Sequence, residues 1–278
     1  MKRNIKDQVI LWVILGVMAL VFVLPFVIMI STSFEYFTFS LPFPPRLLPK
    51  EPVFDNYLEV INSQHIFKYF TNSVLITIVS AVCVMLIASM AAYAFARLEF
   101  RGRESIFKLF LFTLMIPGVL NIIPQYIIIK DIGLIGKRAG LLVLYLGTGA
   151  AGSSFFLRSF FESIPRSIDE AVTLDGGNHW TIFSRIYLPL TKAGLATMGF
   201  LVIQGTWEDF FTAKVMLGGN EDALTLPIML HRLSGQHSTK FGLIFAASLI
   251  TLIPVMILYV IFQKKYVVGG AVKGSVKF

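Results

Sequence analysis

The sequence predicts an all-α membrane protein with six transmembrane helices and a cytoplasmic loop that forms two short helices. Three observations support this fold class. The chain of 278 residues is 56% hydrophobic and only 14% charged, whereas soluble domains carry roughly 25% charged residues. Apolar runs close to the length of about 20 residues that a spanning helix needs occur six times. The charged residues divide unequally between the two sides that these runs define.

We predict the spans from the apolar runs in chain order. They cover about residues 9–30, 69–95, 105–129, 139–161, 193–215 and 241–262. The first run is longer than a signal-peptide core of roughly 7–15 residues and no small-x-small cleavage pattern follows it, so we predict an uncleaved span. Pro117 and Pro124 predict kinks in the third span. The fifth span ends in the polar pair Glu208 and Asp209.

Charge sets the predicted orientation. Six spans place both termini on one side, and that side holds 15 of the 24 basic residues and 7 of the 16 acidic residues. The other side holds equal numbers of each sign, so the whole net charge of +8 lies on the side of the termini. The positive-inside rule then makes both termini cytoplasmic. This distribution also removes the reason to propose nucleic-acid binding.

We treat the whole chain, residues 1–278, as one transmembrane domain with a cytoplasmic loop at 162–192 and a cytoplasmic tail at 263–278. The external loop after the first span contains several prolines, including Pro42 and Pro44, and is predicted to be extended over its first half. The single cysteine, Cys83, excludes a disulfide framework. The four histidines show no zinc-binding spacing, and we predict neither a metal nor a cofactor.

Two glycine-rich stretches superficially suggest nucleotide binding. Residues 147–152 spell G-x-G-x-x-G, but they lie inside an apolar run instead of following a strand. Close packing between helices through small residues is the better explanation. Residues 133–137 lack the spacing of a phosphate-binding loop. We therefore predict that the protein is not an enzyme and that any ATP hydrolysis takes place in a partner subunit.

The cytoplasmic loop carries signals for two short helices. Ser167 and Glu170 have the spacing of a capping box, which predicts the start of the first helix. Gly176 and Gly177 predict its end, because glycine tolerates the left-handed conformation that closes a helix. Asn178 is a candidate cap for a second helix.

The second helix is apolar, with Trp180, Phe183 and Tyr187 on one face and Ile182 and Ile186 as neighbours. Such a helix in the cytoplasm needs a cover. It either folds onto the cytoplasmic ends of its own spans or the headgroup layer, or it docks into a groove of another protein. Amphipathicity alone does not separate these alternatives.

The loop resembles the "EAA" loop of ABC importer permeases. That pattern has Glu-Ala-Ala, a glycine shortly after, and Ile-x-Leu-Pro ten residues beyond the glycine. The matching residues here are Glu170, Ala171, Gly176, Ile186, Leu188 and Pro189. Val172 replaces the second alanine. The resemblance implies that the loop contacts a partner ATPase through these residues together with Ile182 and Phe183.

Other segments resemble the carbohydrate branch of the same family. Residues 206–211 and 224–227 resemble the Trp-Asn-x-Phe and Thr-Leu-Pro segments of sugar permeases, although Glu208 stands where the family usually has asparagine. Residues 265–274 resemble the C-terminus of the maltose-type second permease, which contacts the ATPases. The similarity extends over nearly the whole chain.

The resemblance implies the function and the partners. It implies a subunit of a bacterial importer in the cytoplasmic membrane, which moves a sugar or oligosaccharide by alternating access. The partners would be two ABC ATPase subunits, a second permease of the same family, an extracellular or periplasmic solute-binding protein and the lipid bilayer.

Polar residues near the spans are candidates for the substrate path. Asn121 and Gln125 lie one helical turn apart in the third span, where facing a path and bonding to a neighbouring helix are equally plausible. Trp207 is either a residue of the interfacial aromatic belt or a stacking platform for a sugar. Glu208 and Asp209 face a cavity or partner if they lie within the membrane, and are simply solvated if the span ends earlier.

Three alternatives remain open at this level. The solute of an ABC permease is not always a sugar, and glycerol phosphate is one other candidate. A secondary transporter or channel would work without ATP and would need no docking loop. A structural membrane protein without transport activity would fit the six spans but would leave the two-helix loop unexplained.

Overall fold

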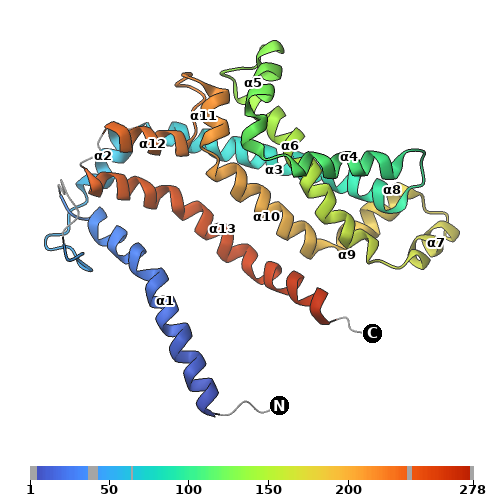
Figure 1. The fold of residues 1–278 in the computed structure, drawn as a ribbon, viewed down its shortest axis with the longest axis horizontal. Helices are drawn as coiled ribbons and strands as arrows, with labels where there is room; N and C mark the ends of the chain where they lie inside the picture. The colour runs from blue at the N-terminus through green and yellow to red at the C-terminus, as the bar shows by residue number, and fades with distance from the viewer. Residues whose placement is uncertain (1–4, 37–42, 64, 237–239, 276–278) are drawn as a thin grey trace. The chain divides into compact units, whose positions relative to one another are not determined.

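The computed structural model describes residues 5–36, 43–63, 65–236 and 240–275, and every regular element in them is a helix (Figure 1). The side chains of residues 5, 63, 236 and 264–275 are not described. The helices are α1 (Ile5–Ser33), α2 (Asp55–Ser63), α3 (Ile66–Arg97), α4 (Arg103–Met115), η1 (Gly118–Asn121), α5 (Ile122–Asp131), α6 (Arg138–Glu162), α7 (Arg166–Leu174), α8 (His179–Thr181), η2 (Ile182–Tyr187), α9 (Leu188–Leu190), α10 (Lys192–Glu208), α11 (Phe211–Leu217), α12 (Leu226–Gln236) and α13 (Phe241–Ser275). The all-α prediction is confirmed.

Four of these helices are long and apolar enough to cross a membrane, and two further pairs qualify if each bent pair is one span. The four helices are Lys6–Ser33, Ile66–Arg97, Arg138–Glu162 and Phe241–Gln263. They lie where the first, second, fourth and sixth spans are predicted. The side chains of residues 6–26 in α1 are all exposed, as expected of a helix surrounded by lipid.

The third predicted span is not a single helix. α4 ends at Met115, and Ile116 and Pro117 have extended backbones with ψ of 119° and 128°. The chain then continues through η1 and α5 at an angle of 99° to α4. Proline drives the preceding residue out of the helical region and has no N–H to donate, which explains the break. Pro124 produces no break, because it lies in the first turn of α5, where an N–H has no helical partner.

The fifth predicted span, 193–215, is also divided, and the structure corrects it. α10 ends at Glu208, Asp209 is extended with ψ of 108°, and α11 begins at Phe211. The Asp209 carboxylate accepts a hydrogen bond of 3.0 Å from the backbone N–H of Thr212 in the first turn of α11. A side chain that caps a new helix competes with continuation of the old one, so the hydrophobic run overestimates the length of this helix.

The chain divides into two compact units, one made of residues 1–67 and 229–253 and the other of residues 68–228 and 254–278. In the first unit, the end of α1 is held by α2. The Asn56 amide donates to the backbone oxygens of Ser33 and Glu35 at 2.9 and 2.8 Å. Gly242 at the start of α13 packs against the same place, since a Cβ there would lie 2.7 Å from the Glu35 oxygen. Residues 37–42 of the predicted extended loop, including Pro42, lie outside the described residues.

The second unit is organised around α3 and α6, which lie side by side (Figure 1). Arg138 donates to Asn72 at 2.9 Å near the N-terminal ends of the two helices. Halfway along, Gly149 faces Val84, and a Cβ on Gly149 would lie 3.1 Å from the valine side chain. The glycine-rich stretch therefore serves helix packing, as the sequence indicates.

Asn72 also fixes the segment that leads into α12. Its amide donates 2.9 Å hydrogen bonds to the backbone oxygens of Asp222 and Leu224, and the hydroxyl of the adjacent Ser73 accepts one of 2.8 Å from the Leu226 N–H. The Lys68 ammonium bonds to Asp222 and holds the pKa of that exposed carboxyl below its usual range. The Thr-Leu-Pro segment is thus attached to α3.

Gly140 in α6 offers a test of this packing. A Cβ there would lie 2.4 Å from the Leu134 carbonyl oxygen and 2.9 Å from Ile129. We expect Gly140→Ala to destabilise the protein by about 1–3 kcal/mol, because backbone must shift to admit the methyl group. The measurement is the apparent melting temperature of the detergent-solubilised protein.

The matched control is Gly147→Ala in the same helix, where a Cβ would meet no atom within 4 Å. This substitution should leave the melting temperature unchanged or raise it, since alanine favours a helix over glycine by up to about 1 kcal/mol. Equal behaviour of the two variants would contradict the close approach at Gly140.

Candidate functional site

The first helix of the cytoplasmic loop, α7, does not start with the predicted capping box. It begins at Arg166, and Pro165 occupies the cap position without a side-chain hydrogen bond. Ser167 therefore lies inside the first turn. The proline ring fixes φ of Pro165 at −60°, near the helical value. Proline also has no N–H that would need a partner at the start of the helix. The helix can therefore begin after Pro165 without a side-chain cap.

The end of α7 agrees with the prediction that Gly176 and Gly177 stop the helix. Gly176 has φ of +82°, and its N–H donates to the Thr173 oxygen at 3.0 Å. The Gly177 N–H donates to the Val172 oxygen at 2.8 Å. This pair of bonds is a Schellman motif. A Cβ on Gly177 would lie 2.5 Å from the Val172 side chain, so both positions depend on glycine.

The second part of the loop starts as predicted. The Asn178 side chain accepts hydrogen bonds from the N–H and the hydroxyl of Thr181 at 2.9 and 3.1 Å. The chain then widens into η2, a π-helical turn in which the Leu188 N–H reaches back to the Phe183 oxygen. Pro189 follows and supplies no N–H. A bend of 79° separates α8 to α9 from α10.

The apolar face of this second helix is covered by the chain's own helices. Ile182, Phe183 and Tyr187 are 1%, 5% and 0% exposed. They pack in one cluster with small residues of α3 and with Phe161 of α6, and Ile186 and Leu188 pack against its edge. Of the two alternatives left open by the sequence, this face therefore folds onto its own spans.

The predicted coupling residues consequently divide into three groups, of which the half-buried one is Ile186 and Leu188. Ile182 and Phe183 are core residues that hold the loop in place, which the sequence-based assignment to an ATPase contact did not anticipate. The exposed members are Glu170, Ala171, Gly176 and Pro189.

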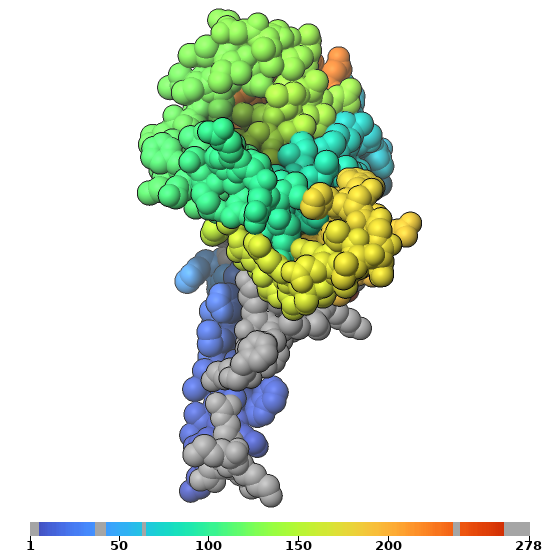
Figure 2. All heavy atoms as spheres, turned by 90° about the vertical axis from the view of Figure 1, so that its right-hand side faces the viewer, coloured from blue at the N-terminus to red at the C-terminus, as the bar shows by residue number. Residues whose placement is uncertain are grey.

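Three large apolar side chains are exposed on the same loop and were absent from the predicted set. Leu174 is 89% exposed, Trp180 is 62% exposed, and Leu190 at the end of α9 is 61% exposed. Figure 2 shows the loop, in yellow, projecting beside the blue-green atoms of α3 and α4. We call Glu170, Leu174 and Trp180 the exposed loop patch. Leu174 and Trp180 lie in α7 and α8, ahead of the π-helical turn, and the predicted apolar face placed Trp180 together with the buried Phe183 and Tyr187.

A cavity of about 460 Å³ lies beneath this patch, between α7, α8 and the end of α3. Tyr93 and Arg97 come from α3, Asp169 and Glu170 from α7, and His179 from α8. Arg97 is one of the 15 basic residues on the side of the termini, and its predicted role was limited to the orientation of the chain. Its place at the junction of α3 and the loop was not foreseeable, because Arg97 and Asp169 are far apart in the chain.

The candidate substrate-path residues differ in their exposure and in their contacts. Trp207 is 5% exposed and its ring meets Phe70 edge-to-face at 5.9 Å, so it is neither an exposed belt residue nor an open stacking platform. Asp209 accepts a 2.7 Å hydrogen bond from the Tyr145 hydroxyl in addition to capping α11. Glu208 is exposed and lies 3.4 Å from the Gln204 amide.

Asn121 ends η1 and Gln125 lies in α5, and both are partly exposed. Among the described residues, the side-chain hydrogen bonds of Glu208 and Asp209 go to Gln204, Tyr145 and Thr212, and not to Asn121 or Gln125.

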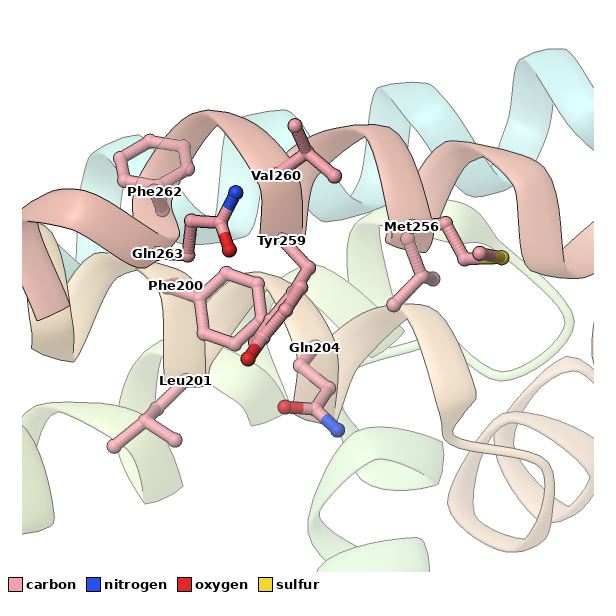
Figure 3. Close-up of a pocket in the computed structure, with 9 residues that line it drawn as sticks. Phe200, Leu201, Gln204, Met256, Tyr259, Val260, Phe262 and Gln263 are labelled. Carbon is pink, nitrogen blue, oxygen red and sulfur yellow. The ribbon is translucent and has the colours of Figure 1, made fainter. Parts of the chain in front are cut away.

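A second cavity of about 390 Å³ lies between α10 and the part of α13 after Pro254. Figure 3 shows the rings of Phe200 and Tyr259 next to each other, with the Gln204 amide close by. The ring centroids of Phe200 and Tyr259 are 6.2 Å apart. Gln204 lines this cavity and lies one helical turn before Glu208 in α10. Among the described residues, no group of acids, histidines and cysteines has a metal-binding arrangement.

Residues 84–267 match the family model of the binding-protein-dependent transport system inner membrane component. The chain belongs to this family. It is a multi-pass inner-membrane permease subunit of a transport system, and the family assignment that the sequence suggested is confirmed.

Relatives of this permease support the same assignment. It is 31% identical to the diacetylchitobiose uptake system permease protein of Streptomyces coelicolor, over 92% of this chain and 85% of that protein. It is 30% identical to the probable starch degradation products transport system permease protein of Thermoanaerobacterium thermosulfurigenes, over 98% and 99%. A crystal structure of a bacterial ABC transporter that imports the acidic polysaccharide alginate has a chain with TM-score 0.80 and 26% identity, covering 95% of this permease and 98% of that chain.

The cap at Asn178 can be tested separately from function. We expect Asn178→Ala to weaken the second loop helix by about 0.5–2 kcal/mol, because the first-turn N–H loses its acceptor. Faster tryptic cleavage of the solubilised permease at the exposed Arg185 is the measurement.

Asn178→Asp is the control, because its carboxylate still accepts from the Thr181 N–H, and it should be cleaved like the parent protein. Indistinguishable cleavage of the alanine variant and the parent would show that the cap contributes nothing to the loop.

Proposed function

We propose that this permease moves a sugar or oligosaccharide across the cytoplasmic membrane by alternating access. ATPase subunits that bind the loop from α7 to α9 would drive this transport. The observation that carries the proposal is the construction of this loop: one face is sealed against the permease core and the other presents apolar side chains outward. Binding to a groove of a partner protein is the common use of such a helical surface.

The exposed loop patch supports the ATPase contact. Leu174 and Trp180 would be costly to leave in water, at about 25 cal/mol for each Å² of apolar surface, and tryptophan is enriched where interfaces concentrate their binding energy. Glu170 adds a charge at the edge of the patch, next to the cavity. The permease has no nucleotide-binding pattern of its own, so the ATPase is a separate subunit.

The orientation follows from charge. Three basic residues lie on the same side of the second unit as the loop: Arg97 at the C-terminal end of α3, Arg103 at the start of α4 and Arg158 in the last turns of α6. The positive-inside rule places this side in the cytoplasm together with both termini. The tail resembles an ATPase contact in sequence, but its side chains are outside the described residues.

The relatives' names favour a carbohydrate solute: diacetylchitobiose, starch degradation products and alginate are the cargoes they specify. The cavity beside α10 has features that suit a sugar, because aromatic rings offer stacking faces and the Gln204 amide offers donors and an acceptor. The exposed Glu208 carboxylate accepts strong hydrogen bonds from hydroxyl groups. Asn121 and Gln125 remain candidates for other parts of the path.

The family name implies a solute-binding protein, and we propose a second, homologous permease as the other half of the pathway. The ATPases close on binding ATP and carry the loop with them, which swings the spans and opens the path outward to receive the solute. To convert a state populated at 1:99 into 99:1, ATP must favour it by about 5.5 kcal/mol. Hydrolysis then restores the inward-open state.

The variants Glu170→Ala and Gly176→Leu test this proposal. We expect the leucine variant to lose most ATPase copurification. A φ of +82° is strained by about 1–2 kcal/mol for a residue with a side chain, so the end of α7 must change conformation and alter the shape of the exposed loop patch. The alanine variant should lose ATP-driven uptake at least severalfold. ATPase copurification is measured on both variants. Uptake by both variants is measured in proteoliposomes with the binding protein, using labelled diacetylchitobiose, maltose and trehalose as probes.

Gly205→Ala is the control, because a Cβ at that position meets no atom within 4 Å and Gly205 lies outside the loop. Normal assembly and uptake in both loop variants would overturn the coupling role. Uptake that continues without ATP and follows an ion gradient would instead identify a secondary transporter.

Glu208→Gln tests the solute path. Loss of one charge-assisted hydrogen bond, worth about 1.5–3 kcal/mol, should lower solute-stimulated ATP hydrolysis by roughly tenfold while basal hydrolysis is unchanged. Asp131→Asn, an exposed acid at the end of α5, is the matched control and should behave like the parent. Unchanged stimulation and solute preference in the Glu208 variant would remove this residue from the path.

A further inference from the structure

We propose that Arg97, Asp169 and Tyr187 form a latch that makes the cytoplasmic loop and α3 move as one rigid body. The inference rests on the proposed function, because it identifies the residues through which a motion of the loop would reach the spans. None of the three belongs to the motif by which the loop resembles importer permeases.

Arg97 is the last residue of α3, and its side chain is only 5% exposed. Its guanidinium donates to the backbone oxygen of Phe161 at 2.6 Å and to that of Ile164. These carbonyls belong to the C-terminal end of α6 and the turn after it, where helical partners run out. A cation is also favoured at this end of the helix dipole. Arg97 therefore joins α3 to α6.

The same guanidinium reaches the loop in two ways. Its Nη1 lies 3.9 Å from the Asp169 carboxylate of α7, and its carbon lies 5.1 Å from the centre of the Tyr187 ring of η2. A planar guanidinium can pair with a carboxylate and stack on an aromatic ring at once, which an ammonium cannot do as well. Arg97 thus contacts both halves of the loop from one position.

Tyr187 closes the network. Its hydroxyl donates to the two Asp169 carboxylate oxygens at 2.9 and 3.0 Å, which connects η2 with α7 inside the loop. Its ring is fully buried and meets Tyr93 of α3 and Phe161 of α6 edge-to-face at 5.2 and 5.4 Å. Ala88, Ala92 and Ala96 recur along one face of α3 in the same cluster and leave room for this approach.

These contacts are directional, and this separates a latch from ordinary packing. An apolar cluster alone tolerates sliding, because its contacts have no preferred geometry. The Arg97 guanidinium holds α7 against α3 and α6, and the Tyr187 hydroxyl holds α7 against η2, where the Tyr187 ring is packed on α3 and α6. A force applied at the exposed loop patch is then transmitted to α3 without being absorbed by deformation at the junction.

The experiment measures this rigidity directly. Spin labels are placed at Ser167→Cys on α7 and Leu75→Cys in the N-terminal half of α3, both exposed, in a Cys83→Ser background. Pulsed electron paramagnetic resonance gives their distance in the complete reconstituted transporter, without nucleotide and with the ATP analogue AMP-PNP. We expect one narrow distance distribution that is the same in both states.

Tyr187→Phe removes one hydroxyl and keeps the ring, so the packing survives. We expect the width of the distance distribution to increase at least twofold with AMP-PNP, and Arg97→Lys to widen it further even without nucleotide. Tyr145→Phe is the matched control, because its hydroxyl also donates to a carboxylate, that of Asp209 at 2.7 Å, but this bond joins α6 to the segment between α10 and α11 and involves neither the loop nor α3. This control should keep the parent distribution.

The latch is overturned if the Tyr187 and Arg97 variants keep the parent distribution in both states, or if the parent distance itself changes with AMP-PNP. It is also overturned if Tyr187→Phe loses ATPase copurification, since the hydroxyl would then shape the docking surface instead of the junction. Failure of the ATPases to copurify with the parent permease would disprove the proposed coupling. The nucleotide-free distances would still decide whether these residues fix the loop to α3.

Discussion

Backbone hydrogen bonding in an apolar environment is the constraint from which most of this structure follows. A chain in lipid must satisfy its N–H and C=O groups internally, because unsatisfied groups cost several kcal/mol each. Long helices meet this condition along their length, and each interruption needs a substitute partner. Asp209 provides one for α11. The same kind of pairing ends and starts the helices of the loop, where Asn178 accepts for α8 and the N–H groups of Gly176 and Gly177 satisfy the last carbonyls of α7.

Helix ends in this protein are also where elements are joined. Arg97 satisfies carbonyls at the end of α6 while it ends α3 and faces α7. Asn72 has the corresponding position near the other end of α3, where it bonds Arg138 and the segment before α12. The second unit is therefore pinned by polar side chains at both ends, and packed through alanine and glycine between them. Such an element can transmit a displacement along its length because polar contacts fix its ends.

The loop from α7 to α9 has both buried and exposed apolar side chains. The burial of Ile182, Phe183 and Tyr187 holds it to its own protein. Leu174 and Trp180 leave apolar surface exposed, which the proposed coupling to a partner would use. The exposed side chains belong to α7 and α8 and the buried ones to η2, so the two kinds of surface lie on successive elements of the loop. Amphipathic periodicity therefore identified the helix without separating its buried face from its exposed one.

Sequence alone determined the features that depend on local composition and on short spacings. The all-α class follows from the apolar runs, the stop at Gly176 and Gly177 from the conformational freedom of glycine, and the second start from Asn178, because each of these effects acts within a few residues. The prolines at 117 and 124 were both read as kinks, yet only Pro117 breaks a helix, because the consequence depends on where a helix begins. Only the tertiary structure decided that Trp207 would be buried and that Arg97 would meet Asp169 and Tyr187. These outcomes depend on side chains that lie far apart in the chain and compete for the same backbone groups, and their meeting is set by how the helices pack.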